Sequence, residues 1–170
     1  MPDLELRGER ALLRPAREGD LDAIVAMLAE PSVARWWGRY DRNRVRTELI
    51  DHPDAETFVV EIDGSVAGIL QISEENDPDY RHAGLDISLA TGFQGRGLGR
   101  EALRVAIDHL AAQRGHHRFT IDPAVENEVA IRCYTAVGFK PVGVMRRYER
   151  APDGSWRDGL LMDLLAGELL

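Results

Sequence analysis

The stretch LDISLATGFQGRGLGREALRVAIDHL, residues 85–110, decides the fold of this chain. It opens with a β-rich run from Leu85 to Ala90, passes through a loop whose segment 94–99 contains three glycines, and continues as apolar residues at helical spacing up to Leu110. Glycines lack a Cβ, so successive backbone N–H groups can approach a ligand, and the start of a helix adds unpaired amides and a positive dipole end. The order strand, glycine loop, helix therefore predicts an anion-binding site.

The spacing of the three glycines excludes two common nucleotide-binding motifs. The loop is not a Walker loop, because no Gly-Lys-Ser/Thr sequence follows it. Gly95, Gly97 and Gly99 alternate, and Arg100 stands where the dinucleotide pattern G-x-G-x-x-G needs its third glycine. ATP and NAD are therefore disfavoured as ligands. A turn with packing glycines is the structural alternative to an anion site.

Further secondary-structure signals lie on both sides of this stretch. The pair Asp63-Gly64 between two β-rich runs is typical of a two-residue hairpin. Before the glycine loop, the pattern predicts strands at 12–14, 57–62 and 65–72 and helices at 20–30 and 42–50. After it, the pattern predicts the end of the helix near Gly115, a strand at 117–121, a helix at 127–137, and closing β segments at 142–150 and 160–164 around a turn at 152–155.

The length of the chain and the order of its elements indicate the fold class. The chain has 170 residues, close to the size of one ordinary domain. Its content of 44% hydrophobic and 29% charged residues is typical of a folded globular protein. We therefore expect one domain over residues 1–170, of class α/β or α+β, with a mixed central sheet flanked by helices.

Composition also limits the partners and the compartment. The 21 Lys and Arg residues against 29 Asp and Glu residues give a net charge of −8, so we expect a cationic or neutral partner and no nucleic acid. No apolar run is long enough for a membrane span, the opening residues lack a secretory pattern, and the single cysteine cannot form an intrachain disulfide. We therefore expect a cytoplasmic protein without membrane contact. The five histidines are scattered, and we expect no metal site; the sequence leaves a homodimer open.

A second motif follows the glycine loop after about thirty residues. Gln94-x-x-Gly97-x-Gly99, followed by Asn127, Ala130, Tyr134, Gly138 and Phe139, resembles the two defining motifs of the GNAT superfamily of acetyl-CoA-dependent N-acetyltransferases. The resemblance covers nearly the whole chain in element order, and it implies a mostly antiparallel sheet and acetyl-CoA as the acetyl donor. It also implies that residues 96–100 bind the pyrophosphate and that Asn127 contacts the pantetheine arm. Asn127 can also cap the helix that it opens.

We expect the cofactor to be bound by the strand end, the glycine loop and the start of the later helix. If the sheet splays at the strand end, unpaired amides of Leu89 and Ala90 can bond pantetheine and the thioester oxygen. The expected cofactor-binding residues are Leu89, Ala90, Gln94, Gly95, Arg96, Gly97, Leu98, Gly99, Arg100 and Asn127. Arg100, Arg104 and Arg118 are candidate partners for other phosphates, with solvated surface charges as the alternative.

Several segments carry a narrower resemblance. The segment 121–139, with Trp36-Trp37-Gly38, Asp77-Pro78 and Gly84-Leu85-Asp86 in the same order, resembles the aminoglycoside 6′-N-acetyltransferases. This resemblance implies a cationic small molecule with a primary amine as the acceptor. Acyltransferases that act on protein N-termini share several of these pieces. They are one alternative, and a non-catalytic coenzyme A binding domain is the other.

Acyl transfer to an amine needs an acceptor for the proton of the substrate ammonium. Asp86 is our candidate for this base and for a contact with the substrate, because it is an acid within an otherwise apolar strand; a partner for an arginine is the alternative. Asp122 at a strand end can clamp a cationic acceptor together with Asp86, or it is a turn residue before a proline. Trp36 and Trp37 are expected to wall the acceptor pocket, with a core position as the alternative.

The departing thiolate also needs a proton, and Tyr134 is our candidate donor. The resemblance places Tyr134 where many GNAT enzymes protonate the coenzyme A sulfur. A phenol with a pKa of about 10 donates without being ionised at neutral pH, although Tyr134 can also simply pack in the apolar face of its helix. Cys133 has no nearby histidine in the sequence to activate it. We therefore expect an inert thiol and direct transfer from donor to acceptor.

Overall fold

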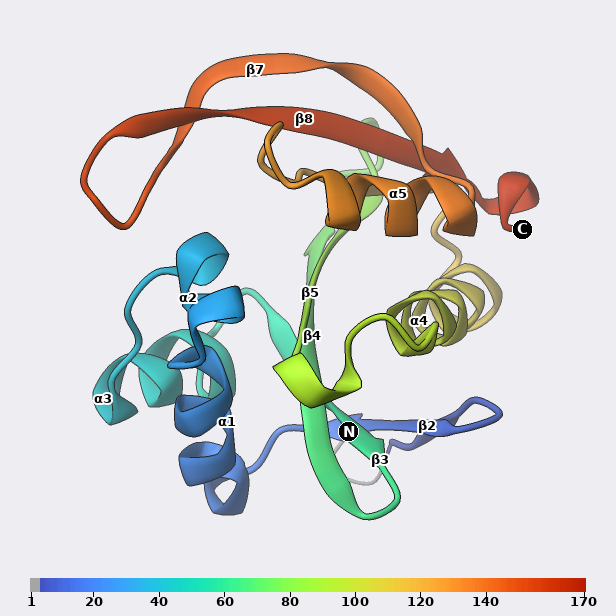
Figure 1. Cartoon of the computed structure of the whole chain (residues 1–170). Helices are drawn as coiled ribbons and strands as arrows, with labels where there is room; N and C mark the ends of the chain where they lie inside the picture. Colours follow the sequence, from blue (N-terminus) through green and yellow to red (C-terminus); the bar gives the residue numbers. More distant parts are fainter. Residues whose placement is uncertain (1–3) are drawn as a thin grey trace.

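A computed structural model describes residues 4–170 and has a mixed sheet of eight strands with helices on both faces (Figure 1). The strands are β1 (Leu6–Arg7), β2 (Ala11–Pro15), β3 (Glu56–Ile62), β4 (Ser65–Glu75), β5 (His82–Leu89), β6 (Arg118–Ile121), β7 (Lys140–Arg150) and β8 (Trp156–Leu165). Their order in the sheet is β1-β2-β3-β4-β5-β6-β8-β7. Among these described strands only β5 and β6 pair in parallel, so the predicted mixed, mostly antiparallel sheet is confirmed.

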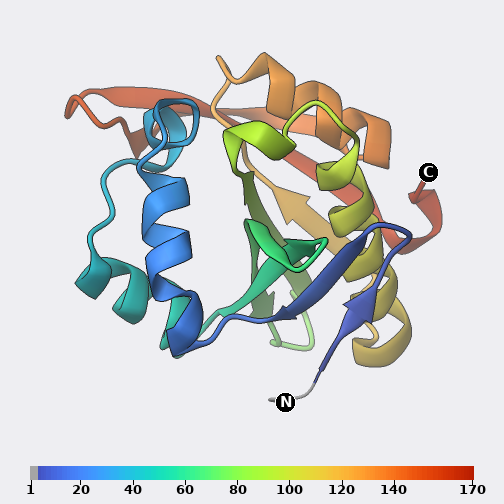
Figure 2. The ribbon, with the colours of Figure 1, turned by 60° about the horizontal axis from the view of Figure 1, so that its bottom comes forward.

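The helices form two groups on opposite faces of the sheet (Figures 1 and 2). The α-helices are α1 (Leu21–Leu28), α2 (Pro31–Trp37), α3 (Arg42–Val45), α4 (Leu98–Arg114) and α5 (Glu128–Val137). The π-helical segment η2 (Arg46–Ile50) continues α3, and the short 3-10 turns are η1 (Glu18–Asp20), η3 (Thr91–Phe93) and η4 (Ala166–Glu168). No helix of residues 4–170 is both long and apolar enough to span a membrane.

Alternation along the central strands explains the two groups of helices. In β3, Phe58 and Val60 are buried with α4 and α5, whereas Val59 between them is buried with α1, α2 and α3. In β4, Leu70 is buried on the face that α4 and α5 cover, and Ile69 is buried on the face that α1, α2 and α3 cover. Successive side chains of a strand point to opposite faces, so a strand that is apolar on both faces must be covered on both.

The β3–β4 hairpin follows from its turn residues. Asp63 has a φ of 50° and Gly64 a φ of 78°, so both lie in the left-handed region that a two-residue hairpin requires. Ile62 and Ser65 pair directly across this turn. The predicted hairpin is confirmed.

The sheet splits next to β5, and this split creates the space for a site. β5 pairs with β6 only at Ala83 and Gly84, so the edge of β5 beyond Gly84 is free of β6. On its other edge β5 stays close to β4, where Gly68 lies opposite Leu89. A Cβ on Gly68 would collide with the carbonyl oxygen of Ser88, so glycine is what permits this close approach.

The segment after α1 differs from the prediction. The helix expected over 20–30 is present as α1, which ends at Leu28, but the second helix, α2, which begins at Pro31, was not predicted. Glu30 is extended, with φ −63° and ψ 134°, because a residue before proline is excluded from the α region. Pro31 then starts α2, since a first helical residue needs no N–H donor. β4 also extends to Glu75, beyond the strand expected at 65–72, and β5 begins at His82, before the expected start at Leu85.

Candidate active site

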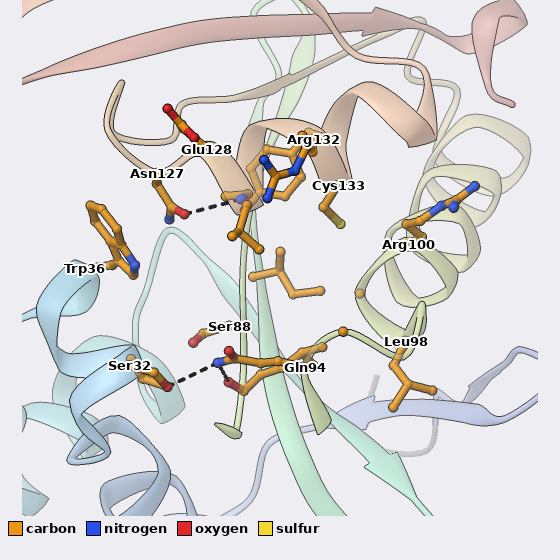
Figure 3. A pocket seen from close by; sticks show the side chains of 18 of the residues that line it. Ser32, Trp36, Ser88, Gln94, Leu98, Arg100, Asn127, Glu128, Arg132 and Cys133 are labelled. Carbon is orange, nitrogen blue, oxygen red and sulfur yellow. Dashed lines mark hydrogen bonds between the residues drawn. The ribbon is translucent and has the colours of Figure 1, made fainter. Parts of the chain in front are cut away.

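Two cavities adjoin at the split in the sheet. The larger cavity, of about 690 Å³, is lined by the end of β5, the glycine loop, the start of α5 and one side of α2 (Figure 3). The smaller cavity, of about 230 Å³, lies over the middle of β5 and the loop after β6. Five residues line both cavities, namely Trp36, Trp37, Ile87, Asn127 and Tyr134. A ligand in one cavity can therefore meet a ligand in the other at these residues.

The glycine loop forms one wall of the larger cavity and has the features of an anion site. Gly95 and Gly97 have φ values of 72° and 76°, which disfavour residues with a Cβ. Gly97 is the N-cap of the 17-residue helix α4 and has no side chain to bond the first amides. The unpaired amides and the positive end of this helix therefore stand at the cavity wall, which Gly95, Gly97, Leu98, Gly99 and Arg100 line.

Gln94 and Arg10 hold the loop from two sides. The Gln94 amide nitrogen donates to the Leu89 carbonyl at 2.9 Å and to Ser32 Oγ at 3.4 Å (Figure 3). Arg10 Nη1 donates to the Arg96 carbonyl at 2.9 Å, and its Nε donates to Glu101 Oε2 at 3.1 Å. Sequence reasoning missed Arg10, because it lies 86 residues from Arg96 in the chain.

The remaining predicted cofactor residues are placed as follows. Leu89 lines the larger cavity, but the Ala90 amide donates to the Ala67 carbonyl at 2.8 Å, so the expectation of an unpaired amide at Ala90 is wrong. Arg96 lies outside the cavity lining, with its guanidinium 5.6 Å from the centre of the Phe93 ring. Asn127 lines both cavities while its Oδ1 accepts from the Ala130 amide at 3.2 Å, so it caps α5 as well.

Only one of the three arginines considered as phosphate partners lies at the larger cavity. Arg100 lines it, whereas Arg104 and Arg118 do not. Arg118 Nε instead donates to Asp163 Oδ2 at 3.1 Å. Arg118 therefore has the alternative role given above, that of a surface charge, and is not placed to bind a phosphate in this cavity.

Three carboxylates line the smaller cavity. Asp86 comes from the middle of β5, Asp122 follows β6, and Glu149, which sequence reasoning missed, comes from β7. Asp122 Oδ2 accepts a hydrogen bond from the Tyr148 hydroxyl at 2.6 Å. No signal in the sequence connects Glu149 to Asp86. Strand β7 reaches the cavity only because it pairs with β8, which lies next to β6 in the sheet (Figure 1). The cavity is therefore suited to a cation.

Asp86 has the properties of a base that works near neutral pH. Its side chain is exposed, and the solvent that it meets is that of the smaller cavity. Desolvation by the surrounding protein, followed by the negative charge of Asp122, raises the pKa of Asp86 to about 7. A general base is most effective when its pKa lies near the working pH. Burial also raises the pKa of Asp122, although the bond from Tyr148 opposes the shift.

Tyr134 lies where the two cavities meet and keeps its proton. It is buried on α5, and its ring contacts Phe139 edge-on with 6.3 Å between ring centres. Burial, followed by the charge of Asp86, raises the pKa of the phenol above its ordinary value. The hydroxyl is therefore protonated at neutral pH and can act as a donor.

Cys133 lies beside Tyr134 and lines the larger cavity (Figure 3). Burial raises the pKa of its thiol, and none of the described residues that line the cavity is a histidine. A protonated thiol without a base is a weak nucleophile, so the surroundings favour an inert cysteine. Across residues 4–170, no three His, Cys, Asp or Glu side chains are grouped to hold a metal ion.

Comparison with known proteins identifies the family. Residues 21–139 match the model of the Acetyltransferase (GNAT) family. The chain is 29% identical over 164 residues to the spermidine N(1)-acetyltransferase of Escherichia coli (strain K12), covering 93% of this chain and 87% of that protein. It is 26% identical over 162 residues to an aminoglycoside N(6′)-acetyltransferase type 1 of Klebsiella pneumoniae, covering 84% and 78%.

Solved structures agree with this match. The structure of Mycobacterium smegmatis RimJ in complex with CoA-disulfide is similar with a TM-score of 0.83 and 29% identity, covering 99% of this chain and 90% of that chain. The family match spans α2, β5, the glycine loop, α4 and α5, which line the larger cavity, whereas Glu149 of the smaller cavity lies outside it. This chain therefore belongs to the acetyltransferase (GNAT) family and is an acetyltransferase.

Proposed function

We propose that this enzyme transfers an acetyl group from acetyl-CoA directly to a primary amine of a cationic small molecule. The observation that carries the proposal is the lining of the smaller cavity, where Asp86, Asp122 and Glu149 surround the approach to Tyr134. A cation is attracted to this cavity, and its amine is brought to the place where the two cavities meet. The names of the E. coli and K. pneumoniae relatives, which denote acetyltransferases for spermidine and for aminoglycosides, support this class of acceptor.

The larger cavity fits acetyl-CoA as the acetyl donor. Acetyl-CoA supplies an activated acetyl thioester when it is bound. The wall formed by Gly95, Gly97 and the first turn of α4 presents backbone N–H groups without Cβ atoms in the way, which suits a pyrophosphate. Leu89 and Asn127 line the path between that wall and Tyr134, and we assign them to the pantetheine arm.

Asp86 and Tyr134 take the two proton transfers. The substrate ammonium must lose a proton before its nitrogen can attack, and the Asp86 carboxylate receives that proton directly or through a water. As the carbon–sulfur bond breaks, the Tyr134 hydroxyl donates its proton to the departing thiolate. Cys133 has no part in this direct route, because its thiol stays protonated.

The size of the smaller cavity favours a slender acceptor. Its volume of about 230 Å³ suits a linear polyamine, whereas an aminoglycoside of three rings would place only one of its rings inside. Trp36 and Trp37 line this cavity together with Tyr40, and this position supports the role that we expect for the two tryptophans as a wall of the acceptor pocket. We also expect the enzyme to act in the cytoplasm, in keeping with its single cysteine.

Thiol release from acetyl-CoA, measured with a panel of amines, tests the proposal. The panel contains spermidine, an aminoglycoside, and peptides with a free N-terminal alanine. We expect the polyamine and the aminoglycoside to be acetylated with higher kcat/KM than the peptides. The double substitution Asp122→Asn and Glu149→Gln is expected to reduce this preference by removing two negative charges. Acetylation of the peptides alone would overturn the proposal.

A further inference from the structure

Arg157 on β8 lies behind the smaller cavity and contacts two of its walls. Its side chain is only 11% exposed. Its Nε donates to Glu149 Oε1 at 2.6 Å, while Nη1 and Nη2 donate to the carbonyls of Arg35 and Trp36 at 3.0 and 2.7 Å. Its guanidinium also lies 5.2 Å from the centre of the Trp36 ring. One buried side chain thus joins β7, β8 and the end of α2.

The contacts to α2 satisfy groups that the helix leaves unpaired. The last carbonyls of a helix have no partner within it, and α2 ends at Trp37, with Gly38 bonded back to Ala34. Arg157 donates to two of these carbonyls and to a carboxylate at the same time. Only the planar guanidinium presents donors in three fixed directions, and a lysine ammonium cannot reproduce this pattern.

The other end of α2 is tied to the glycine loop. The Thr91 amide donates to Glu30 Oε2 at 3.1 Å, and the hydroxyls of Ser32 and Thr91 are bonded at 2.8 Å. Gln94 reaches Ser32 from the loop itself. This end is therefore held by contacts that do not involve Arg157.

We propose that Arg157 is a positioning residue for the acceptor, which holds Trp36, Trp37 and Glu149 in the geometry that the substrate amine requires. The proposal rests on the proposed function, in which the smaller cavity receives the acceptor. Trp36 and Trp37 line that cavity and Glu149 supplies one of its charges, so loss of Arg157 loosens two walls together. Trp36 and Trp37 also line the larger cavity, but the glycine loop and the start of α4, which form its anion-binding wall, have contacts of their own. We therefore expect loss of Arg157 to affect the acceptor more than acetyl-CoA.

Arg157→Lys tests the proposal, with Arg146→Lys on the exposed part of β7 as a matched control. Both are made in a Trp156→Phe background, because Trp156 is the third of the three tryptophans and is 58% exposed. Fluorescence of this background then reports on Trp36 and Trp37 alone. Acrylamide quenching is measured without acceptor, acetyl-CoA affinity by titration calorimetry, and kinetics with spermidine.

For Arg157→Lys we expect stronger quenching, an acetyl-CoA Kd within about two-fold of the background, and an acceptor KM raised by roughly 10-fold. Arg146→Lys is expected to leave all three unchanged. Glu149→Gln is expected to raise the acceptor KM without changing the quenching, since it alters the charge of one wall but not the contacts of Arg157 with the carbonyls of α2.

Two results would overturn the proposal. One is an Arg157→Lys enzyme with unchanged quenching and unchanged acceptor KM. The other is an equal rise in the acetyl-CoA Kd and the acceptor KM, which denotes a general structural role. Failure of the proposed function is distinguishable from both, because the background enzyme would then acetylate neither spermidine nor the aminoglycoside, whereas the quenching experiment needs no acceptor.

Discussion

The ionisation of Asp86 should control the pH dependence of the enzyme. The perturbation is Asp86→Asn, which keeps the shape of the side chain and removes the base. Because desolvation by the surrounding protein and the charge of Asp122 raise the pKa of Asp86 to about 7, the wild-type carboxyl gains its charge within the physiological pH range. Only the ionised form can accept the ammonium proton, so kcat/KM should rise with pH across this range.

The size of the rise follows from the pKa. A carboxyl with a pKa of about 7 is roughly 9% ionised at about pH 6 and roughly 90% ionised at about pH 8, which predicts a rise of about 10-fold in kcat/KM. A carboxyl with the ordinary aspartate pKa would give no rise over the same interval. Asp86→Asn should lower turnover by roughly 10²-fold, with partial recovery at high pH as the acceptor loses its own proton.

The assay is thiol release with a pyridine disulfide that reacts below neutral pH, using the best amine of the panel. Asp122→Asn serves as the companion variant, because its charge contributes to the raised pKa of Asp86. The acidic limb of its profile should move to lower pH. A wild-type profile that is flat from about pH 5.5 to 8 would refute the reasoning, and so would an Asp86→Asn enzyme that keeps a limb near pH 7.

Three further predictions concern single residues. Tyr134→Phe should lower kcat by about 10²-fold, because the thiolate loses its proton donor, and high pH should not restore it. The affinity for acetyl-CoA should be unchanged, and full turnover in stopped assays would exclude the donor role. Gly97→Val should weaken acetyl-CoA binding by at least about 10-fold in calorimetry, since φ is 76° at this residue. The control Gly92→Ala has open space around its Cβ and should bind acetyl-CoA normally. Equal affinities of the two variants would mean that the loop is a turn without a role in binding. Arg10→Ala should raise the acetyl-CoA Kd several-fold without changing the acceptor KM, because it frees the loop at Arg96, and a changed acceptor KM alone would contradict this.

Much of the fold could be predicted because its signals are local. The Asp63-Gly64 turn needs only two residues with positive φ, and the helix after the glycine loop needs only apolar spacing and glycine at its ends. Helix α2 was missed because Pro31 was not used as a start signal, although the sequence contained it. The unpaired amide expected at Ala90 depended on which edge of β5 it faces, and that is decided by pairing with β4.

Some residues of the candidate site could be predicted from the sequence and others could not. Tyr134, Asn127 and the glycine loop belong to motifs with fixed spacings along the chain, so the sequence alone groups them. Their roles remain predictions. Glu149, Arg157 and Arg10 have no such spacing relative to the residues they serve. Each reaches its partner through the sheet, so only the tertiary structure brings it to the site.

The sequence by itself determined the order of the elements except β1 and α2, the family resemblance, and the identity of the candidate donor and base, because these depend on residue type and on spacing over short stretches of chain. The tertiary structure decided the split between β5 and β6, the two adjoining cavities and the raised pKa of Asp86. These depend on burial and on charges from separate strands, and such long-range terms exist only once the chain has packed.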